Sequence, residues 1–226
     1  TAKTGTTVNQ VVIGSGTLTV AAGADTRDAS IILAKSGVEH AVADFRLTSQ
    51  NDLSNITEMT FVNSSTNPSD ARISALRLYK GTTKIAEDFL MTGSATLKIG
   101  TDQLVVAANG NETVTLKVVL NPIENADQSS TTFRANLTQL KYKGSAGTEL
   151  TKTLDIYGNN MQIRKTMPVL ANVSLGTVGA PNTQEEVFKF TVTADANEDV
   201  VLNSLTFVRV GSDATVTDYW LYEGST

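Results

Sequence analysis

Apolar and polar residues alternate along much of this chain with a period of two. The clearest case is the stretch 113–118, Thr-Val-Thr-Leu-Lys-Val, in which every second side chain is apolar. Successive side chains of a β-strand point to opposite faces, so this pattern predicts a strand with one buried face. No segment has the spacing of an amphipathic helix, and the pattern therefore predicts an all-β sandwich or barrel. Similar stretches, bounded mostly by Gly, Asn, Asp or Ser, lie at 84–89, 95–99, 104–106, 133–140 and 150–157.

Three sequence blocks occur twice in the same order, and the polar loop between the last two blocks is shorter in the second copy. The alternation is preserved as well, because Phe45 and Leu47 share one face and their counterparts Phe190 and Val192 do the same. A chance resemblance has no need to preserve inside and outside. We therefore interpret the blocks as a repeat of one β-sandwich module. The corresponding blocks are 43–48 with 188–193, 56–62 with 202–208, and 76–82 with 219–225.

The repeat predicts how the chain is divided. Gly, Asn and Pro between Gly158 and Pro168 indicate a junction, because Pro cannot donate to a central ladder. The second copy contains only half a sandwich, which leaves an apolar face uncovered and strand edges unpaired. We predict a leader strand or linker at 1–16, a complete module at 17–158, a linker at 159–168, and the first half of a second module at 169–226.

Three explanations of the half module are open. The chain can be part of a longer repeat protein, a neighbouring subunit can donate the missing strands, or the second module can be a smaller variant. We favour the first explanation.

The amino-acid composition excludes several classes of function and favours an extracellular chain. The chain has 18 Lys and Arg against 23 Asp and Glu, a net charge of −5, and this acidic balance argues against nucleic acid as a partner. It has no Cys and one His, which excludes thiol catalysis and multi-His or Cys-based zinc sites. No apolar run is long enough to span a membrane. The chain starts at Thr1 without Met or a signal peptide, so we expect a mature or excised extracellular chain. Nothing in the sequence looks like a catalytic site, so we expect no enzyme.

A set of framework motifs resembles a known family. The motifs are Gly-Thr-Leu-Thr-Val at 16–20, Phe-x-Leu at 45–47, Asn-Asp-Leu at 51–53 with Asn-Glu-Asp-Val at 197–200, Leu-Tyr-x-Gly-Thr/Ser at 78–82 and 221–225, and the strand at 113–118. Over most of the chain they resemble the tandem Ig-like repeats of bacterial surface-layer and surface-filament proteins. The resemblance implies tandem Ig-like β-sandwich modules at the cell surface that associate with identical subunits or neighbouring modules. The motifs are core and hairpin positions, so they supply no catalytic residues.

Asp195, Asn197 and Asp199 place side-chain oxygens at alternate positions, as in the first half of a calcium loop. However, Val200 stands where such a loop needs Gly, and no Glu follows at the required position. A calcium site and an ordinary polar hairpin are both open, and the hairpin is the simpler interpretation. We predict no other cofactor.

Trp220 and Tyr222 lie two residues apart in the second copy, where Trp220 replaces Arg77 of the first. An exposed aromatic strip of this kind binds glycans or partner subunits. Alternatively, Trp220 covers the junction between the modules.

His40 is the single histidine. If Ala41, Ala43 and Phe45 point inwards, as the alternation predicts, His40 points outwards. A solvated or edge histidine is then a better interpretation than a catalytic one.

The residues and the resemblance together favour an extracellular structural protein, a subunit or segment of a surface layer or filament. The alternative is an adhesin or carbohydrate-binding module of a secreted multidomain protein, or an accessory domain of a secreted hydrolase.

Overall fold

A computed structural model describes residues 16–68, 72–90, 93–124, 131–175, 186–195, 199–202, 204–208 and 218–224. These residues contain no α-helix, which confirms the all-β prediction. A search of the same residues for a helix long and apolar enough to cross a membrane accordingly finds none. The strands are β1 (Thr17–Ala22), β2 (Ser30–Leu33), β3 (Glu39–Gln50), β4 (Ser54–Asn63), β5 (Ile73–Lys80), β6 (Thr83–Asp88), β7 (Ser94–Lys98), β8 (Val105–Val106), β9 (Asn111–Leu120), β10 (Thr131–Phe133), β11 (Ala135–Lys143), β12 (Glu149–Tyr157), β13 (Met161–Arg164), β14 (Val169–Val173) and β15 (Lys189–Thr193).

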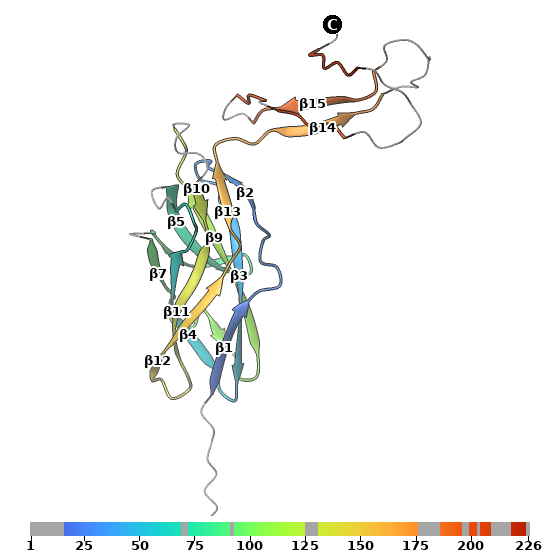
Figure 1. The fold of residues 1–226 in the computed structure, drawn as a ribbon. Helices are drawn as coiled ribbons and strands as arrows, with labels where there is room; N and C mark the ends of the chain where they lie inside the picture. Colours follow the sequence, from blue (N-terminus) through green and yellow to red (C-terminus); the bar gives the residue numbers. More distant parts are fainter. Residues whose placement is uncertain are drawn as a thin grey trace, which may run out of the picture.

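The first thirteen strands form one elongated sandwich (Figure 1). One sheet has the order β1-β3-β9-β5-β6, and the other has the order β12-β11-β4-β7, with β8 paired to β4. A small third sheet, β10-β13-β2, lies at one end and contains a parallel pair, β13 with β2. The strands predicted from the alternation at 84–89, 95–99, 104–106, 113–118 and 150–157 overlap β6, β7, β8, β9 and β12, and the predicted stretch 133–140 spans the end of β10 and most of β11.

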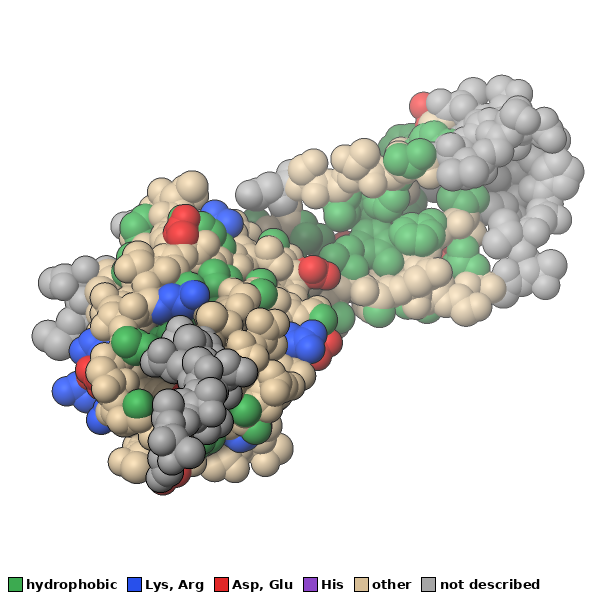
Figure 2. Space-filling model, turned by 90° about the horizontal axis from the view of Figure 1, so that it is seen from below, with side chains coloured by type: hydrophobic (Ala, Val, Ile, Leu, Met, Phe, Trp, Pro, Cys, Tyr) green, Lys and Arg blue, Asp and Glu red, His purple; other side chains and the backbone are tan. Residues whose placement is uncertain are grey.

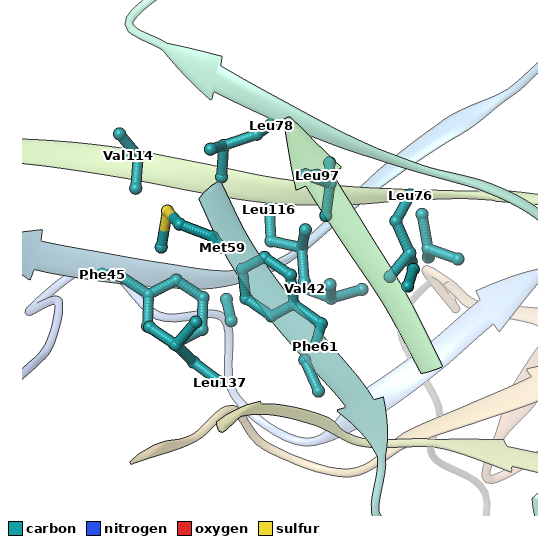
Figure 3. Packing of buried hydrophobic residues seen from close by; sticks show 14 of the residues in the cluster. Val42, Phe45, Met59, Phe61, Leu76, Leu78, Leu97, Val114, Leu116 and Leu137 are labelled. Atoms are coloured by element: carbon teal, nitrogen blue, oxygen red, sulfur yellow. The ribbon is translucent and has the colours of Figure 1, made fainter. Parts of the chain in front are cut away.

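The core lies between the two large sheets, and its centre is a pair of phenylalanines. Phe45 of β3 and Phe61 of β4 are fully buried, and their ring centroids are 5.4 Å apart (Figure 3). Leu116 of β9 and Leu137 of β11 pack into the same cluster from the two sheets. Complete burial of one such side chain contributes about 1.5–3 kcal/mol, so this apolar layer is what holds the sandwich together.

The alternation of β3 is interrupted near its start. Ala43, Phe45 and Leu47 are buried as predicted, but Ala41 is exposed and Val42 is buried, so the prediction that Ala41 points inwards is wrong. The cause is a β-bulge, because the register with β9 shifts between Ala41 and Ala43. One extra residue in a strand reverses the faces on either side of it.

The alternation puts Asp44 on the outer face of β3 together with Arg46 and Thr48, yet Asp44 is buried. The turn after β1 folds over it. The amide of Gly23 donates to the Asp44 carbonyl at 2.7 Å, and the hydroxyl of Thr26 donates to the same oxygen at 3.1 Å. The outer face of β3 is therefore covered at this point by its own neighbouring loop.

The predicted linker 159–168 contains β13, which joins the first sandwich by pairing with β10 and β2. Gly158, which was interpreted as part of the junction, has a packing role. A Cβ atom at this position would lie 2.9 Å from that of Ala43, and the Gly158 amide donates to the carbonyl of Ala135. The first repeat therefore extends to Arg164, and residues 165–168 connect it to β14.

The second repeat reproduces the start of the first. β14 pairs with β15 in an antiparallel hairpin, as β1 pairs with β3. In these hairpins Leu170 faces Val192, and Val20 faces Leu47, the residue to which Val192 corresponds. The repeat seen in the sequence is thus a repeat of structure at this hairpin.

The aromatic pair of the core is repeated too. Phe190 and Phe207, the counterparts of Phe45 and Phe61, have ring centroids 5.9 Å apart at the same interplanar angle of 53°. Residues 204–208 and 218–222 form no strand, however, although their counterparts belong to β4 and β5. In the first repeat those two strands pair with β6, β7, β8, β9 and β11, all of which come later in the chain than the residues repeated here.

Candidate functional site

The second repeat presents apolar side chains on its surface. Phe207 is 55% exposed and Leu221 is 66% exposed, whereas their counterparts Phe61 and Leu78 are fully buried. Figure 2 shows hydrophobic side chains gathered on this part of the molecule, while the first sandwich is covered mainly by polar ones. We call this surface the open face. Its centre is the ring cluster of Phe188, Phe190 and Phe207, and the correspondence with the first repeat assigns Val192, Leu202, Tyr219 and Leu221 to the same side. A contiguous apolar surface of this kind usually marks an interaction site.

Trp220 and Tyr222 are both exposed, at 72% and 56%. Their counterparts in β5 are Arg77 and Tyr79, which lie on the outer face of the first sandwich, since Arg77 pairs with Glu39 and the Tyr79 hydroxyl donates to the same carboxylate. The correspondence with β5 assigns Trp220 and Tyr222 to the side opposite Leu221, and both side chains are accessible.

Of the three predicted calcium ligands, Asn197 lies outside the described residues. Asp195 and Asp199 are described, and Asp199 is exposed. The Asp195 carboxylate forms an ion pair with the ammonium of Lys35, at 2.7 Å from Oδ2. A cation bound to Asp195 would have to displace this ammonium, so the position is a poor fit for calcium. Among the residues that the structure describes, no group of three or more His, Cys, Asp or Glu could hold a metal ion.

His40 has a structural contact. Its Nε2–H donates to the carbonyl oxygen of Leu33 at 2.8 Å and ties β3 to the end of β2. Burial lowers the pKa of His40, Arg27 lowers it further, and the hydrogen bond to Leu33 opposes them. The side chain is half-buried, which explains why a prediction of simple solvent exposure missed this contact.

A cross-strand network that the sequence analysis did not single out lies on the outer face of the first sheet. Glu39 of β3 accepts hydrogen bonds from Arg77 and Tyr79 of β5, at 2.6 and 2.7 Å, and from Lys117 of β9 at 3.3 Å. Burial raises the pKa of Glu39, but these three donors outweigh it and lower the pKa to about 2. The Lys117 ammonium also lies 3.9 Å from the centre of the Tyr79 ring.

This network ties three adjacent strands together. Its members stand at alternate, outward positions of their strands, so the alternation marks them as surface residues. The sequence carries no signal for the register that brings them together.

A shallow polar depression lies at the end of the sandwich near β13. Its lining combines hydroxyl, amide and guanidinium groups without a carboxylate or an imidazole, so it lacks an acid–base pair. Arg134 stacks over the ring of Tyr157 at 4.4 Å and donates to the Gly158 carbonyl. The lining residues are Ala29, Ser64, Ser65, Thr66, Arg134, Asn159 and Asn160.

These features define an all-β protein made of a closed sandwich and an open copy of its first strands. No family model matches the sequence, and no curated protein matches it. Among solved structures, the chain is similar to a DUF4466 family protein from Parabacteroides merdae, with 10% identity over 72% of this chain and 49% of that one, at a TM-score of 0.30. It thus spans about half the length of that protein.

The chain is also similar to the collagen-binding subdomain of the Enterococcus faecalis surface protein ACE. The identity is 11% over 65% of this chain and 95% of that one, at a TM-score of 0.25. At such scores neither likeness carries an argument about what this chain binds.

Proposed function

We propose that this chain is a structural segment of an extracellular surface assembly, a layer or filament built from tandem Ig-like β-sandwich modules. The observation that carries the proposal is the structural repeat. β15, the counterpart of β3, pairs antiparallel with the strand before it as β3 pairs with β1, and the Phe190–Phe207 pair repeats the interplanar angle of Phe45–Phe61. Tandem copies of one sandwich are an economical way to build an extended array.

The direction of the chain supports the same proposal. β1 starts at one end of the first sandwich, and β13 leads the chain out at the opposite end (Figure 1). Only residues 165–168 separate β13 from β14. This arrangement strings successive modules end to end. The net charge of −5 and the absence of Cys are compatible with a chain exposed to the medium.

Electron microscopy of the native protein, isolated from its source without denaturant, tests this function. We expect regular filaments or a lattice with a repeat that matches one module or a small multiple of it. A protein that remains monomeric at all concentrations and ionic conditions, with no ordered array on the cell, would overturn the proposal.

A second candidate function rests on Trp220 and Tyr222. Two exposed aromatic rings on one side of a segment are a common platform for sugars, so an adhesin or carbohydrate-binding role is favoured by this pair. A glycan array compares the native chain with the variant Trp220→Ala. Binding that the substitution abolishes supports this role, and an array without signal above background excludes it for the glycans tested.

A further inference from the structure

Two adjoining depressions lie beside the start of β13 in the first repeat. The first is the polar depression lined by Arg134, with a volume of about 340 Å³, and the second has a volume of about 360 Å³. Because Ala29 and Asn160 line both, the two depressions form one groove, which we call the arginine groove. The residues that line its second part are Ala29, Ser30, Ile31, Thr132, Asn160 and Gln162.

The guanidinium group of Arg134 is held in place by its neighbours. Its Nε–H donates to the carbonyl oxygen of Gly158 at 3.2 Å, and its Cζ atom lies 4.4 Å from the centre of the Tyr157 ring. The Tyr157 hydroxyl in turn donates to the Asp155 carboxylate, which also accepts a hydrogen bond from the Asn136 amide at 2.9 Å. A long side chain that is fixed in this way loses little further conformational entropy when a ligand binds.

These contacts leave hydrogen-bonding groups of the groove available to a ligand. The terminal amino groups of Arg134 have no hydrogen-bond partner among the described residues, and together they match the two oxygens of a carboxylate. The side chains of Ser64, Thr66 and Asn160 line the same depression. Their hydroxyl and amide groups can donate to, or accept from, the hydroxyl groups of a ligand.

The groove is positively charged, although the chain as a whole has a net charge of −5. Arg134 lines its first part, and Arg27 lies beside the second part, where its Nε–H donates to the Ser30 hydroxyl at 2.8 Å. Among the described residues, no carboxylate lines either depression. Asp28 is exposed and lies outside the lining, and Asp155 already accepts two hydrogen bonds. An anionic ligand therefore fits this groove better than a neutral one.

We propose that the arginine groove binds an acidic polysaccharide, a chain of uronic acid units. One sugar carboxylate pairs with Arg134, and the next unit extends past Ser30 towards Arg27. The lining supplies the two kinds of contact that this ligand needs, which are guanidinium groups for the carboxylates and hydroxyl and amide groups for the ring hydroxyls. The inference goes beyond the surface-assembly function, because it gives the module a way to attach to anionic carbohydrate.

Calorimetric titration of the complete chain with tetragalacturonic acid tests the proposal. We expect saturable binding that weakens as sodium chloride is added, because exposed ion pairs contribute to the affinity. The matched neutral ligand is the methyl ester of the same tetrasaccharide, which keeps the ring hydroxyls and removes the charges. The ester should bind at least about tenfold more weakly, since the charge-assisted hydrogen bonds are lost.

Four variants of the chain locate the binding. Arg134→Gln should weaken it at least about tenfold, and Arg27→Gln should weaken it by a smaller factor. Arg46→Gln is the matched control, because it removes the same charge from an exposed position of β3 outside the groove and should leave the affinity unchanged. Asn160→Asp adds a carboxylate at an exposed position shared by both depressions, and it should weaken binding as strongly as Arg134→Gln. Urea unfolding verifies that each variant is folded.

Equal affinity for the acidic tetrasaccharide and its ester, or no binding, overturns the proposal. So do equal effects of Arg134→Gln and Arg46→Gln. Inorganic phosphate that binds more tightly than the tetrasaccharide also overturns it, because the ligand is then a phosphate group. Trp220→Ala should leave this binding unchanged, which separates it from glycan binding at Trp220 and Tyr222. Arrays seen by microscopy stand without tetrasaccharide binding, and tetrasaccharide binding stands without arrays.

Discussion

The two repeats of this chain contain corresponding apolar residues that are buried in the first repeat and exposed in the second. In the first repeat Phe45 and Phe61 lie at the centre of a closed core, whereas in the second repeat Phe207 is 55% exposed although it packs against Phe190 with similar geometry. The local pattern is sufficient to form the hairpin β14–β15 and its aromatic contacts. Closing the sandwich also requires strands that come from later in the module, above all β9 and β11.

The largest difference should appear when the two aromatic residues are truncated. Phe61→Ala leaves a cavity in a closed core and should lower the free energy of unfolding of the first repeat by about 3–5 kcal/mol. Phe207→Ala removes a ring that is already half in water and should cost less than about 1 kcal/mol. Urea unfolding measures both, with far-UV circular dichroism for the first repeat and fluorescence of Trp220, the single tryptophan, for the second. Equal costs would contradict the comparison.

A smaller difference should appear in the pH dependence of stability. The pKa of Glu39 is about 2 in the folded protein, below its ordinary value of 4.5, so its contribution is complete above pH 4.5 and is lost as the pH falls towards 2. Glu39→Gln should therefore cost about 1.5 kcal/mol at pH 7 and progressively less between pH 4.5 and pH 2.

The matched control is Trp220→Ala, which changes the position equivalent to Arg77 in a repeat whose described residues contain no such network. Its unfolding profile should keep the pH dependence of the wild type. A Glu39→Gln cost that stays constant down to pH 2 would show that the network does not favour the ionised carboxylate.

The turns after the Leu-Tyr blocks give a third comparison. Gly81 and Gly224 both have positive φ, at 58° and 76°. Gly81 closes the β5–β6 hairpin, so Gly81→Ala should destabilise the first repeat by about 1 kcal/mol. Gly224→Ala, in a turn whose described neighbours form no paired hairpin, should leave the urea midpoint of the first repeat unchanged. A loss of stability in both variants would mean that the two repeats unfold as one unit.

Calcium should have the smallest effect. The Lys35 ammonium occupies the Asp195 carboxylate, so millimolar calcium should raise the Tm of the wild type by less than about 2 °C relative to chelator. Lys35→Met frees this carboxylate and should increase any calcium response. A large response in the wild type would favour the calcium loop predicted at Asp195, Asn197 and Asp199 over the polar hairpin.

The sequence pattern predicted what depends on alternation alone. The buried positions Ala43, Phe45 and Leu47 follow from it, and so do most strands of the first repeat. The bulge between Ala41 and Ala43 does not, because one inserted residue leaves no mark in a short apolar run. β13 was missed because it has only four residues between a Gly-Asn-Asn stretch and a Pro.

Contacts between segments that are distant in the chain could not be predicted from the sequence either. Asp44 is buried by the loop that carries Gly23 and Thr26, and Glu39 meets Arg77 only through the register of three strands. The candidate sites also differ in how far the sequence alone could predict their surroundings. The exposure of Trp220 agrees with the aromatic strip proposed from the sequence, while the ion pair of Asp195 with Lys35 joins residues 160 positions apart.

Hydrogen exchange of the chain alone tests the central claim, that the second repeat is an open copy of the first. The equivalent segments to compare are amides 43–48 of β3 and 188–193, which include β15. We expect slow exchange limited by global unfolding in the first segment and exchange at least a thousandfold faster in the second. Equal protection of the two segments in a monomeric sample would contradict the claim, because it would mean that the open face is already covered.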